Sequence, residues 1–175
     1  MKKFITTFTG KRFYPLSPRV EDICIEDIAH HLSNICRFTG ACNRFYSVAE
    51  HSWRVSLACK KQHALRGLLH DATEAYLCDV SSPVKYDAAM RPYRDAESVL
   101  DRAICTRFGL PYKMDESIHI ADKRMFATEA RDLMHSSIPY KTEDCYVGII
   151  APLSVESAEM LFLARFNVLF AAIRD

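Results

Sequence analysis

Hydrophobic residues recur along this chain every three or four positions, which is the spacing of one face of an α-helix. Between residues 25 and 35, one helical face carries four apolar side chains: Ile25, Ile28, Leu32 and Ile35. Further segments with helical spacing are predicted at residues 47–60, 64–76, 92–108, 118–134 and 154–173. No run of alternating residues is long enough to predict a sheet. The pattern therefore predicts an all-α fold, with a short irregular or hairpin segment up to about residue 18.

Residues that favour helix ends mark several of these boundaries. Ser47 and Glu50 have the S-x-x-E spacing of a capping box, which predicts that a helix begins at Ser47. Asp115 and Ser154 are residue types that cap helix starts, and each precedes one of the last two predicted helices. Gly109, two residues before a proline, predicts the end of the helix before it.

Length, composition and charge indicate one ordinary globular domain. The 175 residues are 49% hydrophobic and 26% charged, so we expect a single domain over residues 1–175. Lys and Arg number 23 and Asp and Glu number 22, a balance that argues against a nucleic-acid-binding protein. Seven cysteines occur without a C-x-x-C pair, which favours reduced thiols over a disulfide framework or a zinc knuckle.

The apolar stretches suggest neither a signal peptide nor a membrane span. The longest one, residues 160–173, is interrupted by Arg165 and Asn167 and is too short to cross a bilayer. We therefore expect a cytoplasmic protein without a membrane partner. The same stretch makes the last predicted helix apolar almost all the way round, which predicts a homo-oligomer that uses part of this surface. The alternative is a central core helix in a monomer.

The segment from His70 to Glu74 places His, Asp and Glu within an otherwise apolar helical pattern. Burying these groups together costs several kcal/mol unless a cation or hydrogen bonds compensate. His70 and Glu74 are four residues apart and so share a face of the predicted helix, and Asp71 is one step round. Taken alone, the segment could equally be a polar stripe on a half-exposed helix.

Two further residues favour a metal site. His51 lies in the first turn of the preceding predicted helix, and Asp122 is an isolated aspartate in an apolar helical context. With His70 and Asp71 they form a set of two histidines and two carboxylates, which suits a transition metal better than calcium. Four ligands leave positions open for water and substrate. We expect a divalent ion, with Mn, Co, Fe, Ni, Zn and Mg as the candidates.

The order of these four residues along the chain resembles that of the HD-domain metal-dependent phosphohydrolases. The wider sequence, over about residues 10–130, is similar to the compact phage and bacterial members that hydrolyse deoxynucleotides. The segments that carry the resemblance are Gly10–Arg12, Pro15–Leu16, Ile25–His30, Ile35–Phe38, Phe45–Ser52, His70–Tyr76 and Asp79–Lys85. The resemblance implies a single HD-domain helical bundle.

The resemblance also implies a reaction on a small-molecule deoxynucleotide. The first candidate is a dNTP triphosphohydrolase, with dATP among its substrates, that releases deoxynucleoside and tripolyphosphate through a hydroxide activated by a divalent metal. The alternative is a 5′-deoxynucleotidase that acts on dNMPs. A more distant alternative is a non-catalytic regulatory domain that binds a nucleotide. Cyclic-dinucleotide phosphodiesterases share the metal site, but they usually carry further ligands and a sensory domain.

Several roles follow from matching residues to this family. Glu74 is expected to orient or deprotonate the attacking water beside the ligand Asp71, so these two are the catalytic candidates. Arg37 is expected to bind the substrate phosphate, because a guanidinium fits a phosphate in two contacts. The alternatives are a surface salt bridge for Glu74 and a solvated charge for Arg37.

The outer phosphates of a triphosphate would need further positive charge. The resemblance gives Lys85 this role, and Arg91 and Arg94 could add to it, although each could be a solvated surface charge. The chain departs from several relatives at His119, where they carry a lysine three residues before the final aspartate. This departure puts the outer-phosphate contacts in doubt.

Two residues are expected to recognise the sugar. Asp79 matches a position that binds the 3′-hydroxyl of deoxyribose. Phe38 matches a position where a bulky ring excludes the ribose 2′-hydroxyl, with core packing as the alternative. Together they predict a preference for deoxyribose over ribose.

Overall fold

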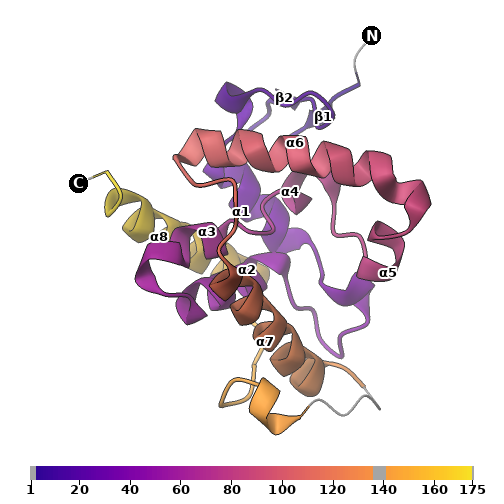
Figure 1. Cartoon of the computed structure of the whole chain (residues 1–175), viewed down its shortest axis with the longest axis vertical. Helices are drawn as coiled ribbons and strands as arrows, with labels where there is room; N and C mark the ends of the chain where they lie inside the picture. The colour runs from indigo at the N-terminus through magenta and orange to yellow at the C-terminus, as the bar shows by residue number, and fades with distance from the viewer. Residues whose placement is uncertain (1–2, 136–140, 175) are drawn as a thin grey trace.

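The computed structural model describes residues 3–135 and 141–174, and helices dominate this part of the chain (Figure 1). The α-helices are α1 (Ile25–Asn34), α2 (Val48–Ala58), α3 (Ala64–Leu68), α4 (Glu74–Leu77), α5 (Ser82–Lys85), α6 (Arg91–Phe108), α7 (Glu116–Leu133) and α8 (Val155–Ala171). Short 3₁₀ helices occur at Val20–Asp22, Phe38–Gly40, Lys61–His63, Ala88–Met90 and Thr142–Asp144. The predicted all-α class is confirmed. No helix in the described ranges has both the length and the apolar character needed to cross a membrane.

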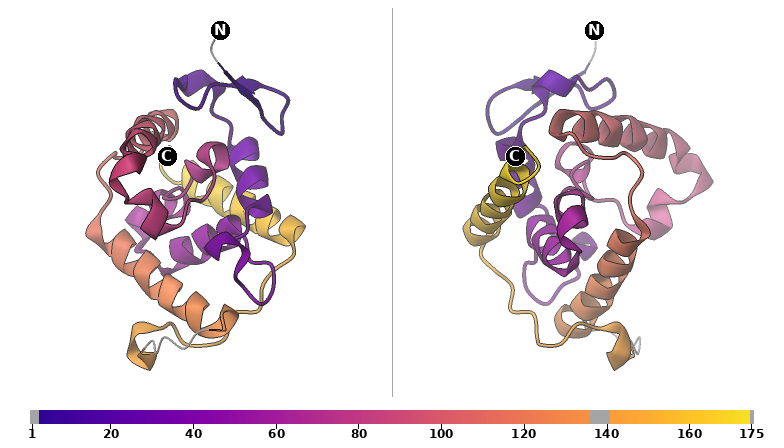
Figure 2. Two further views of the ribbon diagram at one scale, coloured as in Figure 1. Left: turned by 90° about the vertical axis from the view of Figure 1, so that its right-hand side faces the viewer. Right: turned by 60° about the vertical axis from the view of Figure 1, so that its left-hand side comes forward.

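The N-terminal segment forms a small antiparallel hairpin of β1 (Ile5–Thr6) and β2 (Arg12–Phe13), in which Ile5 lies opposite Phe13. Figure 2 shows this hairpin at one end of the molecule. Its turn is fixed to α1, because the backbone amide and the hydroxyl of Thr9 both donate to the buried Asp27 carboxylate, at 2.7 and 3.0 Å. The expected hairpin is therefore present, and it is attached to the helical body.

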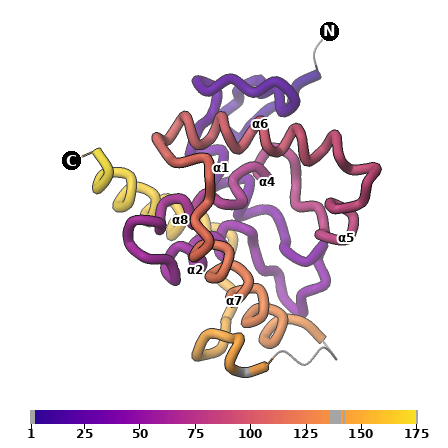
Figure 3. The backbone as a smooth tube through the Cα atoms, in the orientation of Figure 1, coloured from indigo at the N-terminus to yellow at the C-terminus, as the bar shows by residue number. Residues whose placement is uncertain are grey.

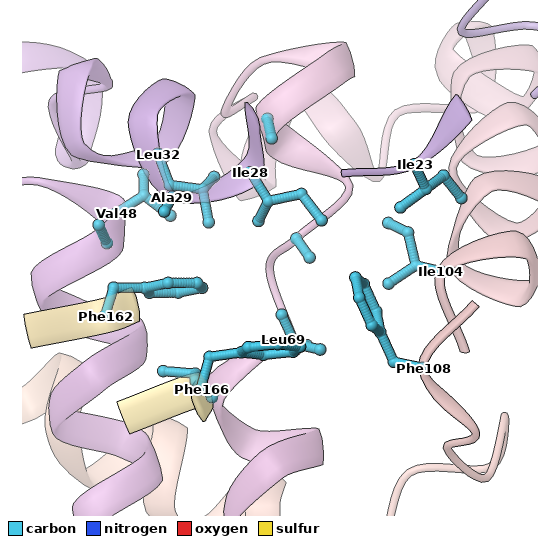
Figure 4. Packing of buried hydrophobic residues seen from close by; sticks show 14 of the residues in the cluster. Ile23, Ile28, Ala29, Leu32, Val48, Leu69, Ile104, Phe108, Phe162 and Phe166 are labelled. Carbon is cyan, nitrogen blue, oxygen red and sulfur yellow. The ribbon is translucent and has the colours of Figure 1, made fainter. Parts of the chain in front are cut away.

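The main core lies among α1, α2, α3, α6 and α8. In Figure 4, Phe162 and Phe166 of α8 point towards Leu32 of α1, towards Phe108 of α6, and towards Leu69, which directly follows α3. Each such side chain stabilises the fold by about 1.5–3 kcal/mol when fully buried. The backbone trace in Figure 3 shows how the last helix returns to α1 and α2, which lie far from it in the sequence. This packing holds α2 firmly, and α2 carries one of the predicted metal ligands.

The last helix has one buried and one exposed face. Its buried residues are Ala158, Phe162, Phe166 and Leu169, and its exposed residues include Met160, Ala164, Val168 and Ala171. The helix is therefore not enclosed within the described chain, and part of its apolar surface faces outwards. The homo-oligomer stays a prediction.

Several predicted helix ends are confirmed. The Glu50 amide donates to Ser47 Oγ at 3.1 Å, so Ser47 caps α2. The Glu50 carboxylate does not complete the capping box, because it binds Arg54 and the amide of Leu153 instead. Gly109 adopts the left-handed conformation, with φ of 67°, that ends α6.

The predicted continuous helix over residues 64–76 is wrong. Helix α3 ends at Leu68, residues 69–73 form turns, and α4 begins at Glu74. A continuous helix would use the Gly67 carbonyl to accept the amide of residue 71. Here His70 Nδ1 lies 2.8 Å from that carbonyl and donates to it instead. The side chain of His70 thus competes with the helical backbone at the residue where the helix stops.

Candidate metal centre

The four predicted ligands converge on one point. His51 comes from α2, His70 and Asp71 from the turn after α3, and Asp122 from α7. The two histidine Nε2 atoms are 3.3 Å apart. Helix α2 packs against both α3 and α7, and this packing brings the four residues together across more than 70 residues of sequence.

The carboxylate oxygens lie close to both nitrogen atoms. Asp71 Oδ2 is 3.2 Å from His70 Nε2 and 3.6 Å from His51 Nε2. Asp122 Oδ1 is 3.1 Å from His51 Nε2 and 3.8 Å from His70 Nε2. Two ligands bound about 2.1 Å from one ion are about 3 Å apart at a right angle and about 4.2 Å apart on opposite sides. All four distances fall within this range, so each carboxylate lies at a suitable distance to share an ion with the two histidines.

His51, His70 and Asp71 form the tightest part of this set. Their ligand atoms all lie within 4.8 Å of one another. Burial strengthens the case, because His51 is fully buried and the His70 side chain is 6% exposed. Two buried imidazole nitrogens facing each other need a shared cation or proton to avoid repulsion between their lone pairs.

Each histidine is oriented by a hydrogen bond at its other ring nitrogen. His51 Nδ1 lies 2.6 Å from Glu129 Oε1, and His70 Nδ1 lies 2.8 Å from the Gly67 carbonyl oxygen. Both partners are acceptors, so both rings carry a proton on Nδ1 and present Nε2 towards the cluster. This is the tautomer that a ligand histidine requires, fixed by a carboxylate or a backbone carbonyl.

Glu129 is a residue of the candidate site that sequence reasoning missed. It lies in α7, is fully buried, and accepts hydrogen bonds from His51 Nδ1, Tyr46 Oη at 2.8 Å and Arg37 Nε at 3.2 Å. Burial opposes its charge, but Arg37 and His51 outweigh this effect and hold its pKa below the usual value. A visible signal was its position seven residues after Asp122, which is two helical turns along the same face.

The charges of the cluster favour a bound cation. Burial disfavours the charged form of His70, yet Asp71 and Asp122 raise its pKa well above the ordinary value. The same interactions lower the pKa of both aspartates despite their burial. Excess negative charge is therefore concentrated at this point, and protonated histidines or a metal ion compensate it.

Glu74 lies beside the cluster and lacks a full set of partners. It is the first residue of α4 and 7% exposed, and its Oε2 atom has no hydrogen-bond partner within the described residues. Burial raises its pKa well above the usual value, and the charges of Asp71 and Asp79 add to this effect. The predicted shared helical face with His70 is lost with the helix break, but Glu74 and Asp71 both line one cavity. The surface salt bridge considered from the sequence does not describe this buried position.

That cavity has a volume of about 730 Å³ and contains both charged and apolar walls. Its charged lining includes Arg37, Asp79, Lys85 and Asp122, and its apolar lining includes Phe38, Phe126 and Met134. A volume of this order is typical of sites for small organic ligands. The predicted residues Glu74, Asp71, Arg37, Phe38, Asp79 and Lys85 all line it. His51 and His70 are not among its lining residues, and His70 lines a second pocket that shares Asp71 with it.

Arg37 is an anchored cation rather than a solvated one. Its side chain is 12% exposed, and NH1 lies 3.6 Å from Asp71 Oδ2 in addition to the bond from Nε to Glu129. Burial opposes its charge, but Glu129 and Asp71 raise its pKa above the ordinary value. Arg37 therefore stays charged beside the ligands.

Phe38 combines an aromatic wall with a strained backbone. Its φ is 54° and that of Thr39 is 52°, both in the left-handed region that bulky residues avoid. The Phe38 ring is half-buried and lies 5.4 Å from the ring of Phe126, measured between centroids. Core packing, the alternative considered from the sequence, does not account for a ring that lines the cavity.

The remaining predicted substrate residues are placed differently from one another. Asp79 lines the cavity, where burial raises its pKa. Lys85 lines it too, but its Nζ lies 2.5 Å from Glu97 Oε1. Arg94 donates to the carbonyls of Lys85 and Asp87 and lines a second, adjoining pocket of about 320 Å³.

Two residues considered in connection with the outer phosphates lie elsewhere. Arg91 is 80% exposed, pairs loosely with Asp95 at 3.9 Å and lines neither pocket. His119 is exposed and also lines neither pocket. Arg91 and His119 thus add no charge to the cavity, and the basic residues that line it are Arg37, Lys85 and Lys123.

Comparison with known proteins gives relatives along nearly the whole chain. No family model matches the sequence. The chain is 40% identical over 173 residues to the protein named "Uncharacterized protein YfdR" of Escherichia coli K12, with 94% of each chain covered. It is 37% identical over 132 residues to "Uncharacterized protein RCAP_rcc00048" of Rhodobacter capsulatus, covering 70% of this chain and 67% of the relative. At this identity and coverage, the chain belongs to the family of YfdR.

Proposed function

We propose that this protein is an HD-type, metal-dependent phosphohydrolase of deoxynucleotides. The observation that carries the proposal is the convergence of His51, His70, Asp71 and Asp122, with both histidines held in the ligand tautomer. A divalent ion, when bound there, would lower the pKa of a water molecule bound to it and polarise a phosphoryl oxygen. The cavity beside this point has the size of a nucleotide site.

Two residues beside the candidate ligands would then have separate roles in the reaction. Arg37, fixed by Glu129, presents a permanent positive charge to a phosphate group at the ligands. Glu74 Oε2 has no other partner within the described residues, so it can accept a proton from the attacking water. Burial raises the pKa of Glu74, which makes its carboxylate a stronger base than an exposed one.

The other end of the substrate would meet different groups. The Asp79 carboxylate can accept a hydrogen bond from a sugar hydroxyl, and a charge-assisted bond of this kind contributes roughly 1.5–3 kcal/mol. The ring of Phe38, with that of Phe126 beside it, offers no hydrogen-bond partner to a 2′-hydroxyl. These contacts support deoxyribose over ribose.

The pairing of the basic residues bears on the length of the phosphate chain. A dNTP carries two more negatively charged phosphates than a dNMP and needs matching cations. Lys85 is paired with Glu97, and Arg94 is bound to backbone carbonyls. Lys123 also lines the cavity and could meet an outer phosphate. The triphosphohydrolase therefore stays the first candidate, and the pairing of Lys85 keeps the 5′-deoxynucleotidase reaction as the second.

A substrate panel tests the proposal. The purified protein is incubated with all dNMPs, dNTPs and rNTPs in the presence of Mn, Co or Mg, and the products are separated by chromatography. We expect hydrolysis of deoxynucleotides that EDTA abolishes and a divalent metal restores. Release of phosphate identifies the nucleotidase reaction, and release of tripolyphosphate identifies the triphosphohydrolase reaction.

A pair of aspartate variants provides the matched control. Asp122→Asn removes a ligand charge, and we expect it to lose nearly all turnover while keeping its helical content. Asp95→Asn makes the same chemical change at an exposed site, where we expect no effect. Full activity of Asp122→Asn, or no hydrolysis of any nucleotide with any of the metals, would contradict the proposal.

A further inference from the structure

An apolar stripe runs along the outer face of α8. Met160, Ala164 and Val168 follow at intervals of four residues, and Ala171 continues the row. Met160 is 61% exposed and Val168 is 66% exposed. Residues with this spacing lie on one side of a helix, so the stripe is continuous over about three turns.

Two charged residues in the middle of the helix are turned away from this stripe. Arg165 donates to the hydroxyl and the carbonyl of Ser56 in α2, and Glu159 lies 3.0 Å from His30 Nδ1 in α1. Both partners lie in helices that pack against the buried side of α8. The central part of the outer face therefore carries no charge, and the exposed polar residue beside the stripe is Asn167.

We propose that this face binds the same face of a second copy of the chain, with the two α8 helices antiparallel about a two-fold axis at Ala164. In that arrangement Met160 meets Val168 of the second copy, and the two Ala164 residues meet at the axis. Alanine at the centre lets the two helix backbones approach closely. An isologous interface of this kind closes on itself and forms a dimer.

The charges at the ends of the stripe complement this arrangement. Glu156 lies in the first turn of α8, and Arg174 lies three residues past its end at Ala171. Both are exposed, so opposite charges stand at the two ends of the stripe. Pairing two antiparallel helices about Ala164 brings the end with Glu156 of one copy to the end with Arg174 of the other. Each end of the interface then gains an ion pair of opposite charges.

Sedimentation velocity at several protein concentrations tests the proposal. We expect a dimer for the wild type and a monomer, or at least a tenfold weaker dimer, for Val168→Glu. Val99→Glu is the matched control, because Val99 is a 54% exposed valine on α6. It should remain dimeric. Circular dichroism checks that both variants keep their helical content.

The outcomes separate the possibilities. A monomeric wild type, a dimer that survives Val168→Glu, or equal dissociation by Val99→Glu would each overturn the proposal. Charge reversal tests the antiparallel arrangement: Glu156→Arg and Arg174→Glu should each weaken the dimer several-fold, and the double variant should regain most of the loss. Failure of the double variant to recover would overturn that arrangement. Because these tests measure mass, their result does not depend on the proposed hydrolysis.

Discussion

Replacing Glu129 by Gln should weaken metal binding without touching a ligand. The carboxylate accepts three hydrogen bonds, from His51 Nδ1, Tyr46 Oη and Arg37 Nε. An amide offers one oxygen and one NH₂ group, so it cannot serve donors on both sides. Either Arg37 or His51 must then face another donor in a fully buried position.

The size of the effect depends on which partner is lost. If the amide oxygen stays with His51, buried Arg37 loses its closest carboxylate and keeps only Asp71, at 3.6 Å. If the amide turns, His51 Nδ1 must accept, and its proton moves to the Nε2 atom that should bind the metal. Changes to partners of this kind cost about 10–100-fold in metal affinity or activity. That corresponds to about 1.4–2.8 kcal/mol.

Calorimetric titration of the metal-free protein with Mn or Zn measures this loss directly. Glu50→Gln is the control, since Glu50 is equally buried but forms its hydrogen bonds with Arg54 and the amide of Leu153 rather than with a candidate ligand. We expect Glu50→Gln to lose thermal stability and to keep its metal affinity. We expect Glu129→Gln to lose affinity at least tenfold in a folded protein. Metal affinities within twofold of wild type for both variants would refute the reasoning and leave Glu129 a purely structural residue.

Three further substitutions test separate features. Cys78 has φ of 67° and ψ of 157°, a backbone region that is almost reserved for glycine. Cys78→Gly should therefore stabilise the fold by about 1 kcal/mol and raise the melting temperature by about 2–4 °C. An unchanged or lower melting temperature would show that no strain is stored there. A Cβ atom at Gly67 would lie 2.7 Å from Cys59 Sγ, so Gly67→Ala should destabilise by about 1–3 kcal/mol in denaturant unfolding. Cys59→Ala should recover most of this loss, and an equal loss in both backgrounds would exclude the clash. Phe38→Ala should raise turnover of ATP relative to dATP by about tenfold with unchanged metal content, and an unaltered ratio would mean that another group selects the sugar.

The residues that come together at the candidate metal centre could be predicted because they are marked by short sequence signals. A His-Asp pair inside an apolar segment is conspicuous, and His51 and Asp122 each stand out in their own helical context. Helix periodicity also gave the correct positions of α1, α2, α6, α7 and α8 within a few residues. These features are local, and each is expressed within one or two turns of helix.

The missed features depend on contacts between distant segments. The pairing of Lys85 with Glu97 joins α5 to α6, and nothing in either segment alone indicates it. In the sequence, Glu129 is one of several charged residues on a long predicted helix. Its role becomes visible only in the structure, where Tyr46, His51 and Arg37 surround it. Tertiary contacts, rather than local propensity, decide what such side chains do.

The backbone strain of the chain is concentrated around the cavity. Within the described residues, the non-glycine residues with positive φ are Phe38, Thr39 and Cys78. Phe38 and Thr39 line the cavity, and Cys78 directly precedes Asp79, which also lines it. Each such residue costs about 1–3 kcal/mol and persists only where surrounding contacts hold it in place. For Cys78 one such contact is the bond that its carbonyl accepts from the Tyr93 hydroxyl, at 2.9 Å. In this chain, the conformation that the overall fold imposes on the backbone conflicts with local backbone preference at the cavity walls that would contact a substrate. A protein under selection for a binding site is expected to tolerate such a conflict there.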